Sequence, residues 1–151
     1  PALGERRNPY AFGDSVVLSR GDQDYWEVRV LDFVADAAEE VAAENPSNEP
    51  PAEGRQFALV TIEVTYLGPD EPTNLFGNLE FGAVDDSNVA YDFEDDCGII
   101  PDRIDQYGDL YRGGTVTGNM CWEVRSNSIE SLLLTVGATS AAGPPIFMAL
   151  R

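Results

Sequence analysis

Acidic side chains concentrate between residues 92 and 105, with a spacing that is relevant to metal binding. Asp92, Glu94 and Asp96 occupy alternate positions, and two further carboxylates follow at Asp102 and Asp105. Calcium binds six to eight oxygen atoms, so this set is a candidate calcium site, and no other cofactor is expected. The segment departs from the D-x-[DN]-x-[DN]-G loop, because a cysteine stands at the glycine position and no Glu follows at the twelfth position. The alternative is an acidic face exposed to water.

The two cysteines, Cys97 and Cys121, are separated by more than twenty residues. Without a histidine or a third cysteine they cannot complete a four-ligand zinc site. We interpret them as a disulfide, which indicates an oxidising, extracytoplasmic location. Two free buried thiols are the alternative.

Aromatic side chains offer a second class of binding chemistry, a flat platform for sugar rings. Trp26, Tyr66 and Tyr91 each lie in phase with apolar neighbours and are expected in the core. This leaves Tyr107 and Tyr111, with Tyr25 as a further alternative, as the candidate surface residues of a carbohydrate-binding module.

Residue types argue against an enzyme. The chain contains no histidine, so histidine-dependent triads and acid–base catalysis are excluded. It contains no lysine either, so it has no G-x-x-x-x-G-K-[ST] phosphate loop. Paired carboxylates are uninformative, because among 27 acidic residues some pair always falls at a suitable separation. We expect a protein without catalytic activity.

The charge limits the range of partners. The formal net charge is −18, from 27 acidic and 9 basic residues, and every basic residue is Arg. Nucleic acid and anionic membranes are poor partners for such a surface, because both require Lys and Arg to neutralise phosphates. No run of eighteen apolar residues is present, so no membrane span is expected. The chain starts at Pro1 without Met, as expected if a targeting segment has been removed, and a lipid anchor on the precursor is compatible with this.

The element that organises the chain is the segment Arg55 to Tyr66. One face carries Ala58, Val60, Ile62, Val64 and Tyr66, while the other face turns polar from Thr61 onward. This alternation in a β-branched, aromatic segment predicts a central strand of a two-layer protein.

Shorter alternating segments flank it, separated by turn residues. We expect strands over residues 14–20, 25–34, 79–84, 89–93, 115–124, 132–136 and 146–150. Asp32 interrupts an apolar row and suggests a bulge. Ala and Glu dominate Asp36 to Asn45, which predicts a short helix, and Asp36 and Glu39 have the spacing of a capping box.

These elements predict an all-β fold, a two-sheet antiparallel immunoglobulin-like β-sandwich with one short helix. Residues 1–13 are expected to be a flexible leader, and residues 14–151 a single domain. Cys121 points away from the apolar row of its strand, so a bridge to Cys97 would fasten the acidic loop over the outer face of the sheet. The predicted core comprises Trp26, Val28, Val30, Val60, Ile62, Val64, Phe81, Tyr91, Val116, Trp122, Leu132 and Leu134.

Several motifs carry a family resemblance that spans nearly the whole chain. They are Asn-Pro before the first strand, W-x-V-x-V in the second, AENPSNEPPAEGRQFALV, CGIIPD, GGTVTGNMCWEV and a terminal FMAL. The chain thereby resembles exported actinobacterial proteins that carry domain of unknown function 4352. The resemblance implies an immunoglobulin-like sandwich behind a signal peptide or lipobox, with two cysteines at the positions of Cys97 and Cys121, which supports the bridge. It implies no catalytic residues.

The sequence therefore predicts a non-catalytic, secreted or cell-envelope binding module with an unknown protein or cell-wall partner. A carbohydrate-binding module and a calcium-binding extracellular domain are the alternatives.

Overall fold

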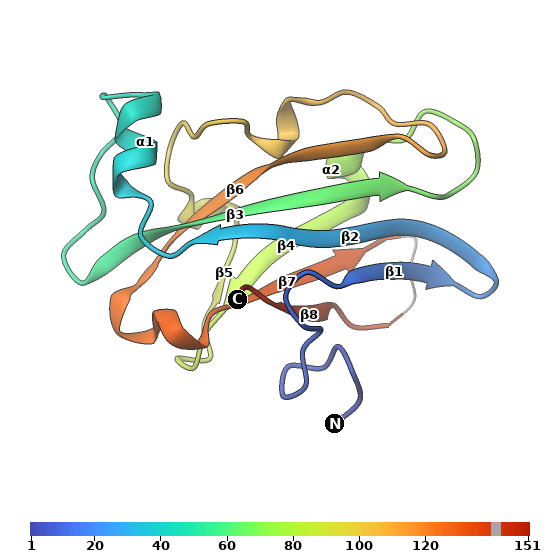
Figure 1. Ribbon diagram of the computed structural model, residues 1–151, viewed down its shortest axis with the longest axis horizontal. Helices are drawn as coiled ribbons and strands as arrows, with labels where there is room; N and C mark the ends of the chain where they lie inside the picture. The colour runs from blue at the N-terminus through green and yellow to red at the C-terminus, as the bar shows by residue number, and fades with distance from the viewer. Residues whose placement is uncertain (140–142) are drawn as a thin grey trace.

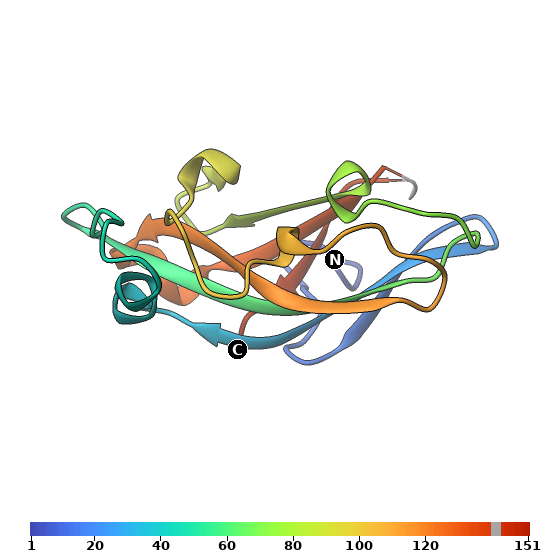
Figure 2. The same ribbon diagram turned by 90° about the horizontal axis from the view of Figure 1, so that it is seen from above.

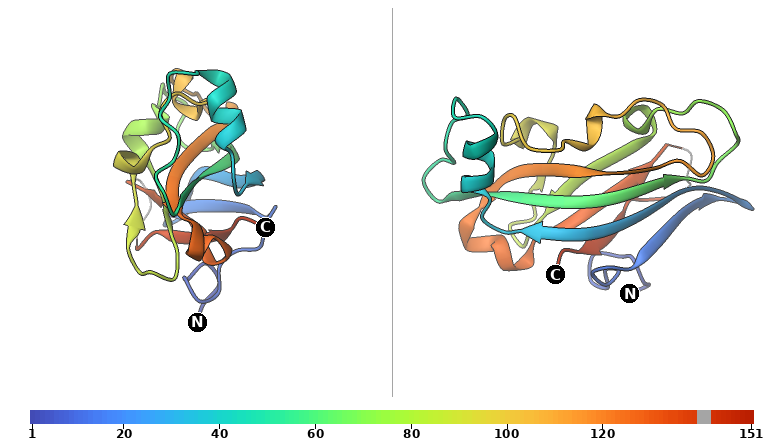
Figure 3. Two further views of the ribbon diagram at one scale, coloured as in Figure 1. Left: turned by 90° about the vertical axis from the view of Figure 1, so that its left-hand side faces the viewer. Right: turned by 45° about the horizontal axis from the view of Figure 1, so that its top comes forward.

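The computed structural model describes residues 1–139 and 143–151, and it consists of two four-stranded antiparallel sheets packed face to face (Figure 1). The first sheet has the order β1 (Ser15–Arg20), β2 (Gln23–Val34), β3 (Arg55–Tyr66), β6 (Thr115–Arg125). The second has the order β5 (Ala90–Tyr91), β4 (Leu79–Val84), β7 (Leu133–Ala138), β8 (Ile146–Ala149). The end-on view separates the two layers (Figure 3). The predicted all-β, two-sheet sandwich is confirmed.

The strand β3 is central, as the sequence predicts. It pairs with β2 on one side and with β6 on the other, in registers that place Val64 beside both Val28 and Val116. Its inward row from Ala58 to Tyr66 is buried in the main core, together with Trp26, Leu134 and Met148. All the predicted core residues are buried except Phe81, which is partly exposed because it lines an opening of the sandwich.

The order of the strands differs from that of immunoglobulin domains. There the second and third strands lie in different sheets. Here β1, β2 and β3 follow one another within one sheet, and the chain crosses to the other sheet only at β4. The predicted irregularity in β2 is present, as a register shift between Val30 and Asp32.

Helical segments are short and peripheral. The α-helices are α1 (Ala38–Glu44) and α2 (Leu75–Asn78), and the 3₁₀ turns are η1 (Phe93–Asp95), η2 (Ile104–Gln106) and η3 (Ser126–Ser131). The predicted capping box of α1 is wrong, because the helix starts one residue late: Ala37 is the N-cap and has no side chain that can cap. Within the described ranges, no helix is both long and apolar enough to cross a membrane.

A second apolar cluster lies on the outer face of the first sheet. Phe57 and Leu59 of β3 pack there with Val41 of α1, Ile100 and the two cysteines. Cys97 and Cys121 form a disulfide with a Cα–Cα distance of 5.7 Å. This confirms the predicted bridge and its position on the outer face.

The segment of residues 1–13, expected to be a flexible leader, hydrogen-bonds to the edge of β8. The Tyr10 N–H donates to the Phe147 carbonyl, and the Ala149 N–H donates to the Tyr10 carbonyl. The Phe147 N–H donates to the Gly4 carbonyl at 2.9 Å. These bonds cover the β8 edge along most of its length.

Candidate functional site

One long side of the sandwich lies between the edge of β6 and the edge of β4. Figure 2 looks down on this side, with β6 in orange, β4 in yellow-green, and the short turns η1, η2 and α2 around the gap. The loop after η1 covers the β6 edge through isolated bridges between Asp96 and Trp122 and between Arg103 and Asn119. The disulfide fastens the same loop to β6.

The β4 edge is open along its first four residues. Its neighbour β5 pairs only with Ala83 and Val84. The sequence predicts a longer strand that continues through Phe93, and this is wrong: Asp92 caps η1 by accepting a hydrogen bond from the Glu94 N–H, so the chain turns away. Among the described residues, no strand therefore pairs with residues 79–82 on the side of β4 that faces β5, although β7 pairs with them on the other side; we call this segment the open edge.

An apolar cleft of about 280 Å³ lies beside the open edge, between the two sheets. Its apolar lining comes from Leu79, Phe81, Ile104, Met120, Cys121 and Trp122. Two phenylalanines, Phe76 of α2 and Phe93 of η1, also line it, with 49% and 79% of their surface exposed. Large apolar side chains exposed at a concave surface are typical of interaction sites.

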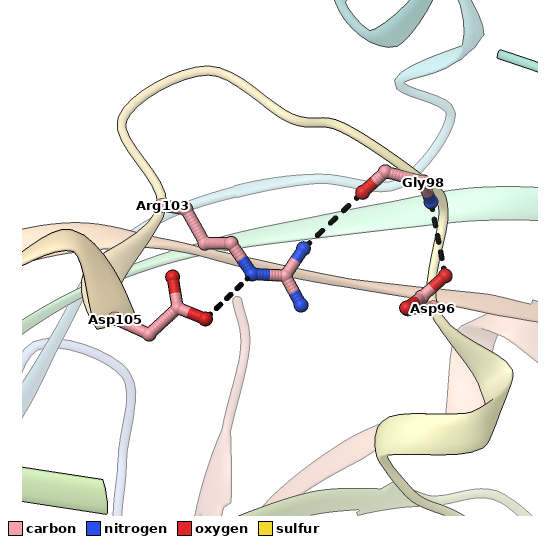
Figure 4. Close-up of polar contacts among 4 residues, drawn as sticks. All are labelled: Asp96, Gly98, Arg103 and Asp105. Atoms are coloured by element: carbon pink, nitrogen blue, oxygen red, sulfur yellow. Dashed lines mark hydrogen bonds and ion pairs between the residues drawn. The ribbon is translucent and has the colours of Figure 1, made fainter.

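The polar wall of the cleft is built from the loop itself (Figure 4). The Arg103 Nε donates to Asp105 Oδ2 at 3.0 Å, and its Nη1 donates to the Gly98 carbonyl at 3.2 Å. Asp96 Oδ1 accepts from the Gly98 N–H at 3.1 Å. The ion pair is about 40% exposed on each side, so it contributes only about 0–1 kcal/mol to stability. Its consequence is geometric, because together with the bond to the Gly98 carbonyl it fixes the shape of the loop that lines the cleft.

A glycine in β6 lets η2 form the floor of the cleft. A Cβ atom on Gly118 would lie 2.6 Å from Ile104 Cα and 2.9 Å from the Asp102 carbonyl oxygen. No other residue type fits this approach of backbone to backbone. Asn119, beside Gly118, hydrogen-bonds to the same loop. Its side-chain amide donates to the Pro101 carbonyl, and its backbone N–H donates to the Asp102 carbonyl.

The structure does not assemble the candidate calcium ligands. Asp92 and Asp95 serve as the capping pair of η1, while Asp96 binds the Gly98 N–H. Glu94 lies within η1 and is exposed. In the part of the chain that the structure describes, no group of three or more His, Cys, Asp or Glu side chains converges as a metal site would require.

The candidate sugar-binding tyrosines are on the surface. Tyr107 follows η2 and is 43% exposed, and Tyr111 is 56% exposed. Neither residue lines the cleft, and the structure describes no ring contact between them.

A buried polar network closes the β5 end of the sandwich, and the sequence did not indicate it. Asp85 is only 2% exposed; its Oδ2 accepts from the Tyr91 hydroxyl at 2.6 Å, and its Oδ1 accepts from the Ser87 N–H and hydroxyl. Arg125 Nη1 donates to the Tyr91 hydroxyl at 2.6 Å and to Ser87 Oγ at 3.2 Å. The Arg6 guanidinium donates to the Asp85 carbonyl. The network joins the turn after β4 to β5, β6 and the N-terminal segment.

The network shifts two pKa values. Burial raises the pKa of Asp85, but hydrogen bonds from Ser87 and Tyr91 and the charge of Arg125 outweigh it, so the pKa lies below its ordinary value of 3.8. Burial and the hydrogen bond to Asp85 raise the pKa of Tyr91 above 10.0.

Phe76, Phe93 and Arg103 were not singled out from the sequence as site residues. Phe76 lies in a one-turn helix with no apolar period, and Arg103 lies in an irregular loop. Phe93 continues an apolar alternation, which predicts a strand residue and not an exposed site residue. Gly118 did carry a signal, because a glycine inside a strand often marks the close approach of another backbone.

Comparisons with known proteins identify the fold and no function. A conserved hypothetical protein from Bacillus anthracis is similar, with 15% identity, a TM-score of 0.50, and coverage of 93% of this chain and 95% of that chain. A "putative lipoprotein" from Staphylococcus aureus subsp. aureus NCTC 8325 aligns at 10% identity and a TM-score of 0.38, over 88% of each chain. No family model matches the chain, and no curated protein matches it. The resemblance to domain of unknown function 4352 stays a prediction.

Proposed function

We propose that this chain is a non-catalytic binding module of the bacterial exterior, and that the cleft beside the open edge is its recognition surface. The observation that carries the proposal is the exposure of Phe76 and Phe93 at an apolar cleft between the two sheets. Burying these rings against a partner would remove a large apolar area from water.

The disulfide supports an exported location. Cys97 and Cys121 are both buried in the outer cluster and are bonded to each other. Such bonds persist in oxidising compartments and are rare in the cytosol. The bridge also holds the loop that carries Asp96 and Arg103 at the cleft.

The lining of the cleft supports binding without catalysis. Its only sulfur nucleophile, Cys121, is oxidised to the disulfide. Arg103 is paired with Asp105, and Asn119 bonds to Thr61 and Pro101. The polar groups thus shape the cleft, and the chain has no histidine to serve as a general base.

A carbohydrate-binding module is the second candidate, favoured by the exposure of Tyr107 and Tyr111. The two proposals predict that different variants lose binding. Retention on cell-wall polysaccharide should weaken with Tyr107→Ala or Tyr111→Ala if sugars bind there, and with neither if the cleft is the binding surface.

The testing experiment compares two phenylalanines. Purified, oxidised protein is incubated with washed cell-envelope material, and the retained fraction is measured for Phe93→Ser and Phe12→Ser. Phe12 is 42% exposed and does not line the cleft, so it controls for the loss of an exposed ring. We expect retention to fall with Phe93→Ser only. Equal retention of both variants and the native protein would refute the cleft as the binding surface.

A further inference from the structure

We propose that the open edge of β4 binds an extended, basic peptide segment of a partner protein as an added strand, with one of its apolar side chains in the cleft. The inference rests on the proposed function and names the class of partner. Strand addition to a free edge is a common mode of peptide recognition, in which backbone hydrogen bonds give affinity and side-chain hollows give specificity.

The first observation is the state of the sheet edges. The loop from Asp96 to Arg103 covers β6, and the N-terminal segment covers β8. The edge strand β1 has a register shift between Leu18 and Ser19, and such bulges reduce pairing with other chains. The open edge at residues 79–82 lies in a regular strand, paired in unbroken register with β7 on its other side.

The second observation is that hollows lie on both faces of this edge. The inner one is the cleft, which Leu79 and Phe81 line. The outer one, of about 450 Å³, is lined in part by Glu80, Gly82 and the cross-strand residue Thr135. Successive side chains of an extended peptide point to opposite faces of a sheet, so an added strand would place them alternately in these two hollows.

The size of the cleft suits a side chain of the bound peptide. Sites for drug-sized ligands usually measure about 300–1,000 Å³, and the cleft of about 280 Å³ is slightly smaller than that. It matches one bulky apolar side chain, which the exposed rings of Phe76 and Phe93 would cover.

Charge selects a basic partner. Glu80 and Asp92 line the outer hollow, and Asp96 and Asp105 line the cleft. Among the described residues that line the two hollows, Arg103 is the only basic one, and it is already paired with Asp105. The whole chain has a net charge of −18. An alternating peptide with Arg toward the outer hollow and an apolar residue toward the cleft complements both faces of the edge.

The test uses the peptide acetyl-Arg-Phe-Arg-Leu-Arg-amide and the ¹⁵N-labelled native protein. We expect the backbone amide signals of residues 79–82 to shift on titration. Two versions of the peptide carry N-methyl groups on alternate amides, one on the odd positions and one on the even positions. Only one set of N–H groups can face β4, so one version should bind about tenfold or more weakly while the other retains its affinity.

The controls separate strand addition from simple attraction. The peptide with Glu in place of each Arg should not shift the spectrum, and Phe93→Ser should weaken binding of the Arg peptide where Phe12→Ser does not. Equal binding of both N-methylated versions, or no shift at residues 79–82 at millimolar peptide, would overturn the inference. If envelope retention still depends on Phe93 in that case, the cleft remains the binding surface and only the strand-addition proposal fails.

Discussion

Gly118 of β6 lies directly against Ile104 of η2, so closely that a Cβ atom on the glycine would come within 2.6 Å of Ile104 Cα. Ile104 is buried and lines the cleft. This one contact therefore connects the regular sheet to the irregular loop that shapes the candidate site.

Replacing this glycine should displace the loop. Because the opposing atoms are backbone, they cannot move aside as a flexible side chain would, and we expect Gly118→Ala to lower the free energy of unfolding by about 1–3 kcal/mol. Urea unfolding monitored by tryptophan fluorescence measures the loss. Gly108→Ala is the matched control, since a Cβ at Gly108 meets no atom within 4 Å. Equal stability of the two variants would contradict the close packing of η2.

Removing the disulfide should destabilise the whole domain. Cys97 and Cys121 are 24 positions apart, and closing a loop of that length restricts the unfolded chain by about 3 kcal/mol. We expect the Cys97→Ala, Cys121→Ala double variant to lose about 2–5 kcal/mol in urea unfolding. Mass spectrometry of the unreduced native protein after alkylation supplies the control, and two modified thiols would contradict the bridge.

Acid should weaken the Asp85 network. The pKa of Asp85 in the folded protein lies below 3.8, so its carboxylate stabilises the fold above that pH, and the contribution is lost as pH falls from 3.8 through the folded pKa. We expect Asp85→Asn to cost about 1.5–3 kcal/mol at pH 7 and to lose less stability than the native protein on further acidification. Asp86→Asn is the control, because Asp86 is the exposed neighbour of Asp85. Parallel pH profiles of native protein and Asp85→Asn would exclude the network as the cause.

Salt should stabilise the protein to the same extent whichever cation it contains. The chain has a net charge of −18, and the described residues form two ion pairs, both largely exposed, so repulsion is screened by any salt. We expect CaCl₂ and NaCl at equal ionic strength to raise Tm by the same amount. An additional, saturable increase with calcium would revive a site at Asp92, Glu94 and Asp96.

The sheets were predictable because burial dictates alternation. β3 was predicted with its observed bounds, since one row from Ala58 to Tyr66 packs into the core. The disulfide was predictable because the chain has two cysteines and no histidine to complete a zinc site with them. Its place on the outer face was predictable because Cys121 and the core residue Trp122 are adjacent in a strand and so point to opposite faces.

The cleft was not predictable because its residues lie where periodicity ends. Phe93 continues the alternation of Val89 and Tyr91, and only the local capping of η1 by Asp92 turns it outward. The network of Asp85, Tyr91 and Arg125 joins residues up to 40 positions apart, which depends on tertiary pairing that no local pattern encodes.

Site-specific photo-crosslinking in cells that produce the protein tests most directly whether a partner binds at the cleft. Benzoylphenylalanine is placed singly at Phe76, Phe93 and Phe12, and the products are resolved by mass after irradiation. We predict the same covalent adduct from positions 76 and 93, which flank the cleft, and none from position 12. Adducts that form equally at all three positions, or at position 12 alone, would contradict a partner bound at the cleft.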